Sequence, residues 1–218
     1  MGSYPGGVLL LCLLSAWIGG IASAQDPTWS RLPWEERIGI GWYQSQAERG
    51  DPEAQYRLGL LLETGIGREA DEGAARRSYE AAARQGHGPA QFALARLLHE
   101  EEPHLAAAWY RRAAEAGSPG AAFNLGLMLE NGQGIPADHE KAIEYYEMAF
   151  AGGLPQAALH RGLLEIKRFS PDRVLALAWL LKAKEGGAAQ ADQAIEVISA
   201  SMSEAEKTRA EALALGSP

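Results

Sequence analysis

The feature that most constrains this chain is a glycine that returns at nearly regular intervals. Gly50, Gly86, Gly117, Gly153 and Gly187, called the anchor glycines below, follow one another at intervals of thirty-six, thirty-one, thirty-six and thirty-four positions. Alanine follows each at the fourth position: Ala54, Ala90, Ala121, Ala157 and Ala191. Glycine or alanine follows the first four at the ninth position: Gly59, Ala95, Gly126 and Gly162. Columns held in register over several periods indicate an array of one repeated structural unit.

Each period predicts two helices. The first is expected at about Glu53–Glu63 in the first repeat, where apolar residues recur at helical spacing. The second is expected at about Glu140–Ala151 in the third repeat. An acidic residue precedes every second helix, where it can cap the free amide groups: Asp71, Glu102, Asp138 and Asp172. The anchor glycine then suits the left-handed position that ends a helix.

A glycine pair, Gly132 and Gly134, raises the alternative of a phosphate-binding loop. The pair stands fifteen and seventeen positions after Gly117, and the first repeat has glycines at the same two offsets, Gly65 and Gly67. No lysine followed by serine or threonine completes a nucleotide-binding pattern. The pair is therefore predicted to be a repeated turn between helices.

Aromatic residues stand eight positions before four of the anchor glycines, at Trp42, Trp109, Tyr145 and Trp179, and Ser78 takes this place in the first repeat. Trp109, Tyr145 and Trp179 are predicted to fill the space between helix pairs rather than to stack on a ligand. The small residues nine positions after the anchors are predicted to let neighbouring helices approach closely.

Both ends of an array need a polar cap. Residues 25–49 are read as an arm followed by a capping helix at about Trp34–Arg49. In the arm, Trp29 is expected either to pack on the helices or to anchor a partner. Residues 199–218 are read as a closing helix at about Glu204–Leu215, started by a Ser203–Glu206 capping box, and Gln190–Ser199 predicts one more first-type helix.

Residues 1–24 are typical of a secretory signal peptide. They hold no charged side chain, a short apolar run and Ala22-Ser23-Ala24 just before Gln25. The run is too short for a flanked membrane span, so no stable span is expected after cleavage. The missing basic residue near Met1 leaves two alternatives open: a different start, or an uncleaved anchor. The single cysteine, Cys12, lies in this segment, so the mature chain would hold none. A periplasmic or secreted location follows.

The sequence holds no recognisable catalytic constellation. The formal net charge of -8 argues against a nucleic-acid partner. His99 and His104 flank Glu100, Glu101 and Glu102, but a solvated charged loop is favoured over a metal site. No zinc-protease or nucleophile-elbow motif is present, and no polar cluster is seen to interrupt the repeat. No catalytic residue, metal or cofactor is therefore predicted.

The two best-matched stretches are AQYRLGLLLETGIG (Ala54–Gly67) and AAFNLGLMLENGQGIPADHEKAIEYYEMAFAGG (Ala121–Gly153). They resemble the Sel1-like repeat (SLR) family, a relative of the tetratricopeptide repeats, which are the second choice. Against the family pattern, the second repeat lacks the glycine loop, and the fourth has Arg161 in place of leucine and lacks both loop glycines. The resemblance implies an all-α solenoid, an α-α superhelix of about four stacked helix pairs in residues 50–198 with caps at both ends, and a concave surface lined mainly by the first helices.

The resemblance implies a non-enzymatic scaffold or adaptor of the bacterial envelope that binds a protein or peptide on the concave face. Two alternatives stay open: a structural or stress-related envelope protein without a dedicated partner and, less favoured, a hydrolase like the β-lactamase-like SLR proteins, whose repeat cysteines this chain lacks. The oligomeric state is left open. The candidate partner-binding residues are polar positions of the first helices: Glu53, Arg57, Asn124, Gln156 and His160.

Overall fold

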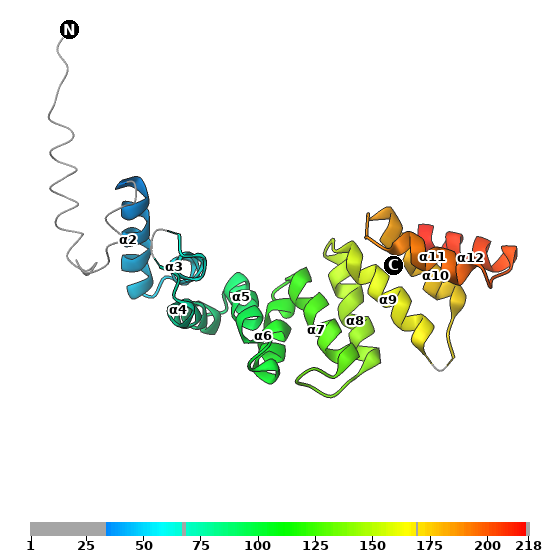
Figure 1. The fold of residues 1–218 in the computed structure, drawn as a ribbon, viewed down its shortest axis with the longest axis horizontal. Helices are drawn as coiled ribbons and strands as arrows, with labels where there is room; N and C mark the ends of the chain where they lie inside the picture. The colour runs from blue at the N-terminus through cyan, green and yellow to red at the C-terminus, as the bar shows by residue number, and fades with distance from the viewer. Residues whose placement is uncertain (1–33, 67–68, 169, 217–218) are drawn as a thin grey trace, which may run out of the picture. The chain divides into compact units, whose positions relative to one another are not determined.

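In the computed structural model of the protein, the residues described here are 34–66, 69–168 and 170–216. Every regular element in these residues is an α-helix (Figure 1). In chain order they are α2 (Trp34–Glu48), α3 (Pro52–Thr64), α4 (Glu72–Arg84), α5 (Gly88–Leu98), α6 (Pro103–Glu115), α7 (Pro119–Asn131), α8 (His139–Ala151), α9 (Pro155–Lys167), α10 (Arg173–Glu185), α11 (Ala191–Ser199) and α12 (Glu204–Leu215). The all-α prediction is confirmed, and α3–α4, α5–α6, α7–α8 and α9–α10 are the four helix pairs.

The chain divides into two compact units, residues 1–94 and 95–218, and each is described by itself. The predicted signal peptide and the predicted arm up to Pro33 lie outside the described residues. Among the residues that are described, no helix is long and apolar enough to cross a membrane.

Three of the four predicted acidic caps at second helices are confirmed. The side chains of Asp71, Asp138 and Asp172 each accept a hydrogen bond from the backbone amide three residues ahead. Glu102 precedes α6 but makes no such bond, and glutamate, whose side chain is one carbon longer, is not among the residues that favour this capping position. The Ser203–Glu206 capping box is present in α12. Helix α11 begins one residue later than predicted, since Gln190 takes a left-handed conformation with φ of 72°.

The glycine positions confirm the turn interpretation. All five anchor glycines have positive φ, between 80° and 92°. Gly132 and Gly134 have φ of 69° and 70°, and Gly65 has 68°, while Gly67 lies outside the described residues. Two loops close with the same bond of 2.9 Å, from the Asp71 amide to the Leu62 carbonyl and from the Asp138 amide to the Leu129 carbonyl.

The core is built on a column of tyrosines that stands one position after the predicted aromatic column. Tyr79, Tyr110 and Tyr146 stand seven positions before an anchor glycine and are fully buried, and Leu180 takes this position in the fourth repeat. Two of these rings lie directly on the predicted small residues. A Cβ added to Gly59 would meet the Tyr79 ring at 2.5 Å, and one added to Gly126 would meet the Tyr146 ring at 2.7 Å. The close approach predicted for these glycines is confirmed.

The predicted aromatic column is only partly right. Of the three residues predicted to fill the space between helix pairs, Trp179 is buried, with 8% of its surface exposed, whereas Trp109 and Tyr145 are half-buried. Trp42, for which no such packing was predicted, is 54% exposed. The reason is the helical period of about 3.6 residues, which turns neighbouring positions about 100° apart. The next residue along, and not the predicted one, faces the first helix of its own repeat.

Candidate functional site

The first and third repeats share a buried tyrosine–glutamate bond that leads to the polar surface of the first helices. The Tyr146 hydroxyl donates a hydrogen bond of 2.7 Å to Glu130, and Tyr79 donates one of 2.7 Å to Glu63. Both glutamates stand at the thirteenth position after an anchor glycine. Burial raises the pKa of Tyr146, and its bond to the Glu130 carboxylate adds to the rise. The tyrosine therefore remains a donor, and the glutamate is kept at the end of the first helix.

Glu130 is the centre of a polar cluster in the second unit. Its carboxylate also accepts a hydrogen bond of 2.6 Å from Lys167, and His160 Nδ1 lies 4.0 Å away. Burial opposes the ionisation of Glu130, but the hydrogen bonds from Lys167 and Tyr146 outweigh it and lower the pKa. The result is an ionised, largely buried carboxylate held by α8 and α9.

The His160 ring packs into this cluster rather than standing in solvent. Its centroid lies 5.1 Å from the Phe123 ring and 5.6 Å from the Tyr146 ring. Burial lowers the pKa of His160, the charge of Glu130 opposes this, and Lys167 adds to the lowering. The imidazole is therefore kept neutral at pH 7, with one edge against aromatic rings.

The first unit carries a more exposed cluster on α3 and at the start of α5. Arg57 Nε donates a hydrogen bond of 2.6 Å to Glu53, and His87 Nε2 lies 2.9 Å from the other carboxylate oxygen. His87 Nδ1 accepts from the Ala90 amide at 3.2 Å, so a neutral His87 carries its proton on Nε2 and donates it to Glu53. The Tyr56 ring lies 5.0 Å from the His87 ring.

The pKa values in this cluster follow from its ion pair. The hydrogen bond from Arg57 and then that from His87 lower the pKa of Glu53, and the bond to Glu53 raises the pKa of Arg57. The side chains of Arg57 and Glu53 are 52% and 54% exposed. Both charges therefore remain accessible to a partner.

The structure separates the five predicted binding residues into different settings. Glu53 and Arg57 are brought together in one ion pair, and His160 is half-buried in the Glu130 cluster. Gln156 is exposed on α9, one turn before His160. Asn124 is half-buried, and its side chain hydrogen-bonds the Tyr110 hydroxyl, where burial raises the pKa of the tyrosine. Asn124 is thus partly engaged in holding the helix pair.

Sequence reasoning missed His87, Glu130 and Lys167. The sequence does contain a signal for Glu130, because Glu63 and Glu130 both stand at the thirteenth position after an anchor glycine. Their partners Tyr79 and Tyr146 both stand at the seventh position before the next anchor glycine. His87 and Lys167 carry no such signal, because their partners Glu53 and Glu130 are 34 and 37 residues away along the chain.

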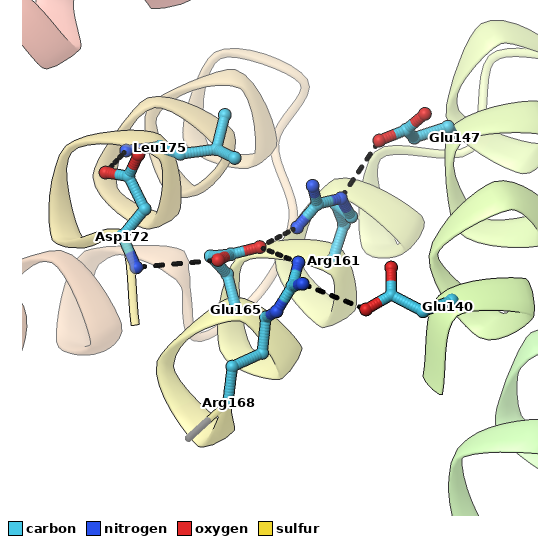
Figure 2. Close-up of polar contacts among 7 residues, drawn as sticks. All are labelled: Glu140, Glu147, Arg161, Glu165, Arg168, Asp172 and Leu175. Atoms are coloured by element: carbon cyan, nitrogen blue, oxygen red, sulfur yellow. Dashed lines mark hydrogen bonds and ion pairs between the residues drawn. The ribbon is translucent and has the colours of Figure 1, made fainter. Parts of the chain in front are cut away.

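A second polar network lies between α8 and α9 (Figure 2). Arg161 donates a hydrogen bond of 2.8 Å to Glu165 and another of 3.0 Å to Glu147. Arg168 reaches Glu165 at 3.3 Å and Glu140 at 2.9 Å. Arg161 and Glu165 are 5% and 3% exposed, so two charges are buried beside each other.

This network replaces apolar residues of the other repeats. Arg161 stands at the position of Leu58, Leu94 and Leu125, and Glu165 at that of Leu62, Leu98 and Leu129. Arg168 stands where Gly65 and Gly132 turn the chain. The Asp172 amide reaches the Glu165 carboxylate at 3.5 Å, where the first and third repeats use a backbone carbonyl. A side chain thus closes a loop that is two residues shorter.

The prediction that no polar cluster interrupts the repeat is therefore wrong. Arg161 departs from the family pattern in the sequence, and the structure shows that Glu165, four residues later, is a second departure paired with it. The network consists of guanidinium groups hydrogen-bonded to carboxylates, and it contains no serine, threonine or cysteine. In the part of the chain that the structure describes, no three histidine, cysteine or acidic side chains are grouped so that they could hold a metal, the His99–His104 loop included.

Comparisons with known proteins agree with this geometry. The family model described as Sel1 repeat matches residues 52–87, 88–118, 119–154 and 157–187. An uncharacterised protein of Neisseria meningitidis serogroup B is 32% identical over 155 residues, which are 69% of this chain and 33% of that protein. A chitin synthase regulator of Malassezia restricta is 34% identical over 114 residues, 49% of this chain and 8% of the regulator. The chain thus spans a third or less of the length of these relatives.

Solved structures show the same fold. A Sel1 repeat protein from Oxalobacter formigenes aligns with a TM-score of 0.64 and 26% identity, covering 80% of this chain and 77% of that one. A protective antigen of uropathogenic Escherichia coli with an SLR fold aligns with a TM-score of 0.52 and 24% identity, covering 80% and 47%. Four consecutive repeat matches cover more than half of the residues, and the helix pairs coincide with them. The chain belongs to the Sel1 repeat family.

Proposed function

We propose that this protein is a non-enzymatic interaction scaffold of the bacterial envelope, and that it holds a protein or peptide partner on the polar surface of its first helices. Sel1 repeat proteins are typically protein-interaction scaffolds. Stacked repeats offer long surfaces that suit extended or helical segments. The envelope location rests on the signal-peptide features of residues 1–24.

The observation that carries the proposal is the Glu53–Arg57–His87 cluster. It combines one exposed anion, one exposed cation and an aromatic ring at Tyr56. Arginine and tyrosine are enriched where interfaces bind most tightly. In the second unit Gln156, His160 and Lys167 add polar groups along α9. A partner segment with both charge signs and an aromatic residue would suit the Glu53–Arg57–His87 cluster of the first unit.

The test is crosslinking of the tagged protein in cells, followed by mass spectrometry of envelope fractions. One variant removes the cluster by Glu53→Ala with Arg57→Ala. The matched control is Glu80→Ala with Arg84→Ala, which removes an ion pair of 3.1 Å at the same spacing on the second helix α4. The Glu53–Arg57 pair is exposed, while Glu80 is half-buried and also pairs with Arg76, so the control variant should lose at least as much stability as the cluster variant, each by about 1 kcal/mol or less.

The proposal predicts one enriched partner that the cluster variant loses and the control keeps. A partner kept by both variants would place binding elsewhere on the protein. No enriched partner would favour the structural or stress-related alternative. Hydrolysis of a β-lactam by the purified protein would support the enzymatic one. Fractionation and the mass of the N-terminus test the envelope location separately, and a protein found only in the cytoplasm would contradict it.

A further inference from the structure

The first repeat contains a hollow where the fourth repeat is filled. The hollow has a volume of about 340 Å³ and lies between α2, α3 and α4. Its apolar walls come from small or aliphatic side chains, with one hydroxyl among them: Ala47, Leu58, Leu62, Ala74, Ser78 and Ala81. Ser78 stands in the column where Trp109, Tyr145 and Trp179 stand in the later repeats.

The equivalent place in the fourth repeat shows what such a site accepts. At the same offsets from the anchor glycines, Trp179 replaces Ser78, Phe150 replaces Ala47 and Lys182 replaces Ala81. The Trp179 ring packs edge-on against Phe150 at 5.5 Å and lies under the Lys182 ammonium at 5.1 Å. In the fourth repeat an indole thus occupies this position, and the first repeat has Ser78 in its place.

The buried polar side chain in the hollow already has hydrogen-bond partners, so an aromatic ring can bind beside it. Gln55 is buried, donates to the Ala47 carbonyl at 3.1 Å and accepts from Gln85 at 2.8 Å. A ring beside it would therefore leave no hydrogen bond broken. At the rim, Glu48 and Arg77 are exposed charges of opposite sign without an ion-pair partner among the described residues.

We propose that this hollow is a binding site for an indole side chain and that its occupant is Trp29 of the same chain. The described structure begins at Trp34, five residues later, and five extended residues span about 17 Å. Gln44, the first lining residue of α2, is ten residues along the helix, or about 15 Å from Trp34. An arm running back beside α2 therefore reaches the site.

Charge complementarity supports this occupant. Asp26 precedes Trp29 by three residues and Arg31 follows it by two. These charges match Arg77 and Glu48 at the rim. The first repeat would thus complete its aromatic column with a residue from the arm, a role that is independent of any partner on the first helices.

The test uses the protein purified as cells produce it, with its N-terminus identified by mass spectrometry, and labelled with 5-fluorotryptophan. Trp29→Phe identifies the fluorine resonance of Trp29. In the unmodified protein, the Trp29 resonance should shift little between H₂O and D₂O, as expected for a buried ring. Ser78→Trp fills the hollow, so in that variant the Trp29 resonance should show the full shift of an exposed ring. A fully exposed Trp29 in the unmodified protein would overturn the proposal, whether or not the Ser78 variant folds.

Thermal unfolding gives an independent measurement. Trp29→Ala should lower Tm by about 4 °C in the unmodified protein and by less than about 1 °C when Ser78→Trp is also present. The control is Trp42→Ala, an exposed tryptophan on α2 that should lower Tm equally in both backgrounds. An equal effect of Trp29→Ala in the two backgrounds, or none in either, would contradict the assignment and leave the hollow to a partner's side chain.

Discussion

Arg161 and Glu165 form an ion pair of 2.8 Å at two core positions that leucines hold in each of the other three repeats. Neither residue could be buried alone, because an unpaired charge in the interior is strongly disfavoured. The two departures from the repeat are therefore coupled, because each charge is buried only together with the other. They also connect α9 to α8 through Glu147 and Glu140.

Replacing one member of this pair should be more costly than replacing both. Glu165→Leu leaves Arg161 buried with only Glu147 and should lower the free energy of unfolding by about 3 kcal/mol. Arg161→Leu with Glu165→Leu restores the leucines of the other repeats and should come within about 1 kcal/mol of the unmodified protein. Urea unfolding followed by circular dichroism measures both. If the double variant is as unstable as the single one, the two charges are not coupled.

The buried tyrosine hydroxyl should contribute measurably to stability. Tyr146→Phe removes a donor from the Glu130 carboxylate and should cost about 1.5 kcal/mol in the free energy of unfolding. The control is Tyr145→Phe, at the half-buried neighbouring position. The same comparison in the first repeat is Tyr79→Phe, whose hydroxyl bonds Glu63 at 2.7 Å. Equal losses in Tyr145→Phe and Tyr146→Phe would show that the hydroxyl bond adds nothing.

The two glycines of the third-repeat loop should differ in their tolerance of a side chain. Both have positive φ, so alanine at either costs about 1 kcal/mol in backbone strain. A Cβ at Gly134 would also lie 2.5 Å from the backbone of Pro103, whereas at Gly132 the nearest atom is at 3.5 Å. Gly134→Ala should therefore lower Tm several degrees more than Gly132→Ala.

Calorimetry of both loop variants measures this difference. The result also tests the alternative of a phosphate-binding loop. If the glycines served only to bind a ligand, the alanine variants would lose binding but keep their Tm. Equal Tm values for the two variants would show that the loop does not rest on the start of α6.

His160 should make the second unit sensitive to mild acid. Burial lowers its pKa below the ordinary value of 6.5, so the unfolded chain takes up the proton first as the pH falls. The free energy of unfolding should therefore decrease below about pH 6.5, until the pH passes the folded-state pKa. His160→Gln should flatten this part of the stability curve, measured by urea unfolding at successive pH values.

The matched control for this pH effect is His104→Gln, at an exposed position of α6. An unchanged slope in the His160 variant, or an equal change in the control, would contradict the assignment. The lowered pKa of Glu130 adds a separate loss at lower pH, below the ordinary value of 4.5, since its ionised form stabilises the folded state.

The sequence by itself determined the helix pairs, the glycine turns and most helix starts, because these depend on residues within one period of each other. The anchor glycines, the capping aspartates and the small residues at Gly59 and Gly126 all repeat at fixed offsets. Periodicity therefore made them visible without any tertiary information.

Only the tertiary structure decided which neighbouring column is buried and which charges meet. Tyr146 and Tyr145 are adjacent and chemically alike, and the rotation of α8 alone decides that the first lies on Gly126. Likewise, Lys167 meets Glu130 across 37 residues, and His87 meets Glu53 across 34. Such pairs depend on how successive helices pack, and a repeat pattern in the sequence does not give the distance between side chains of different helices.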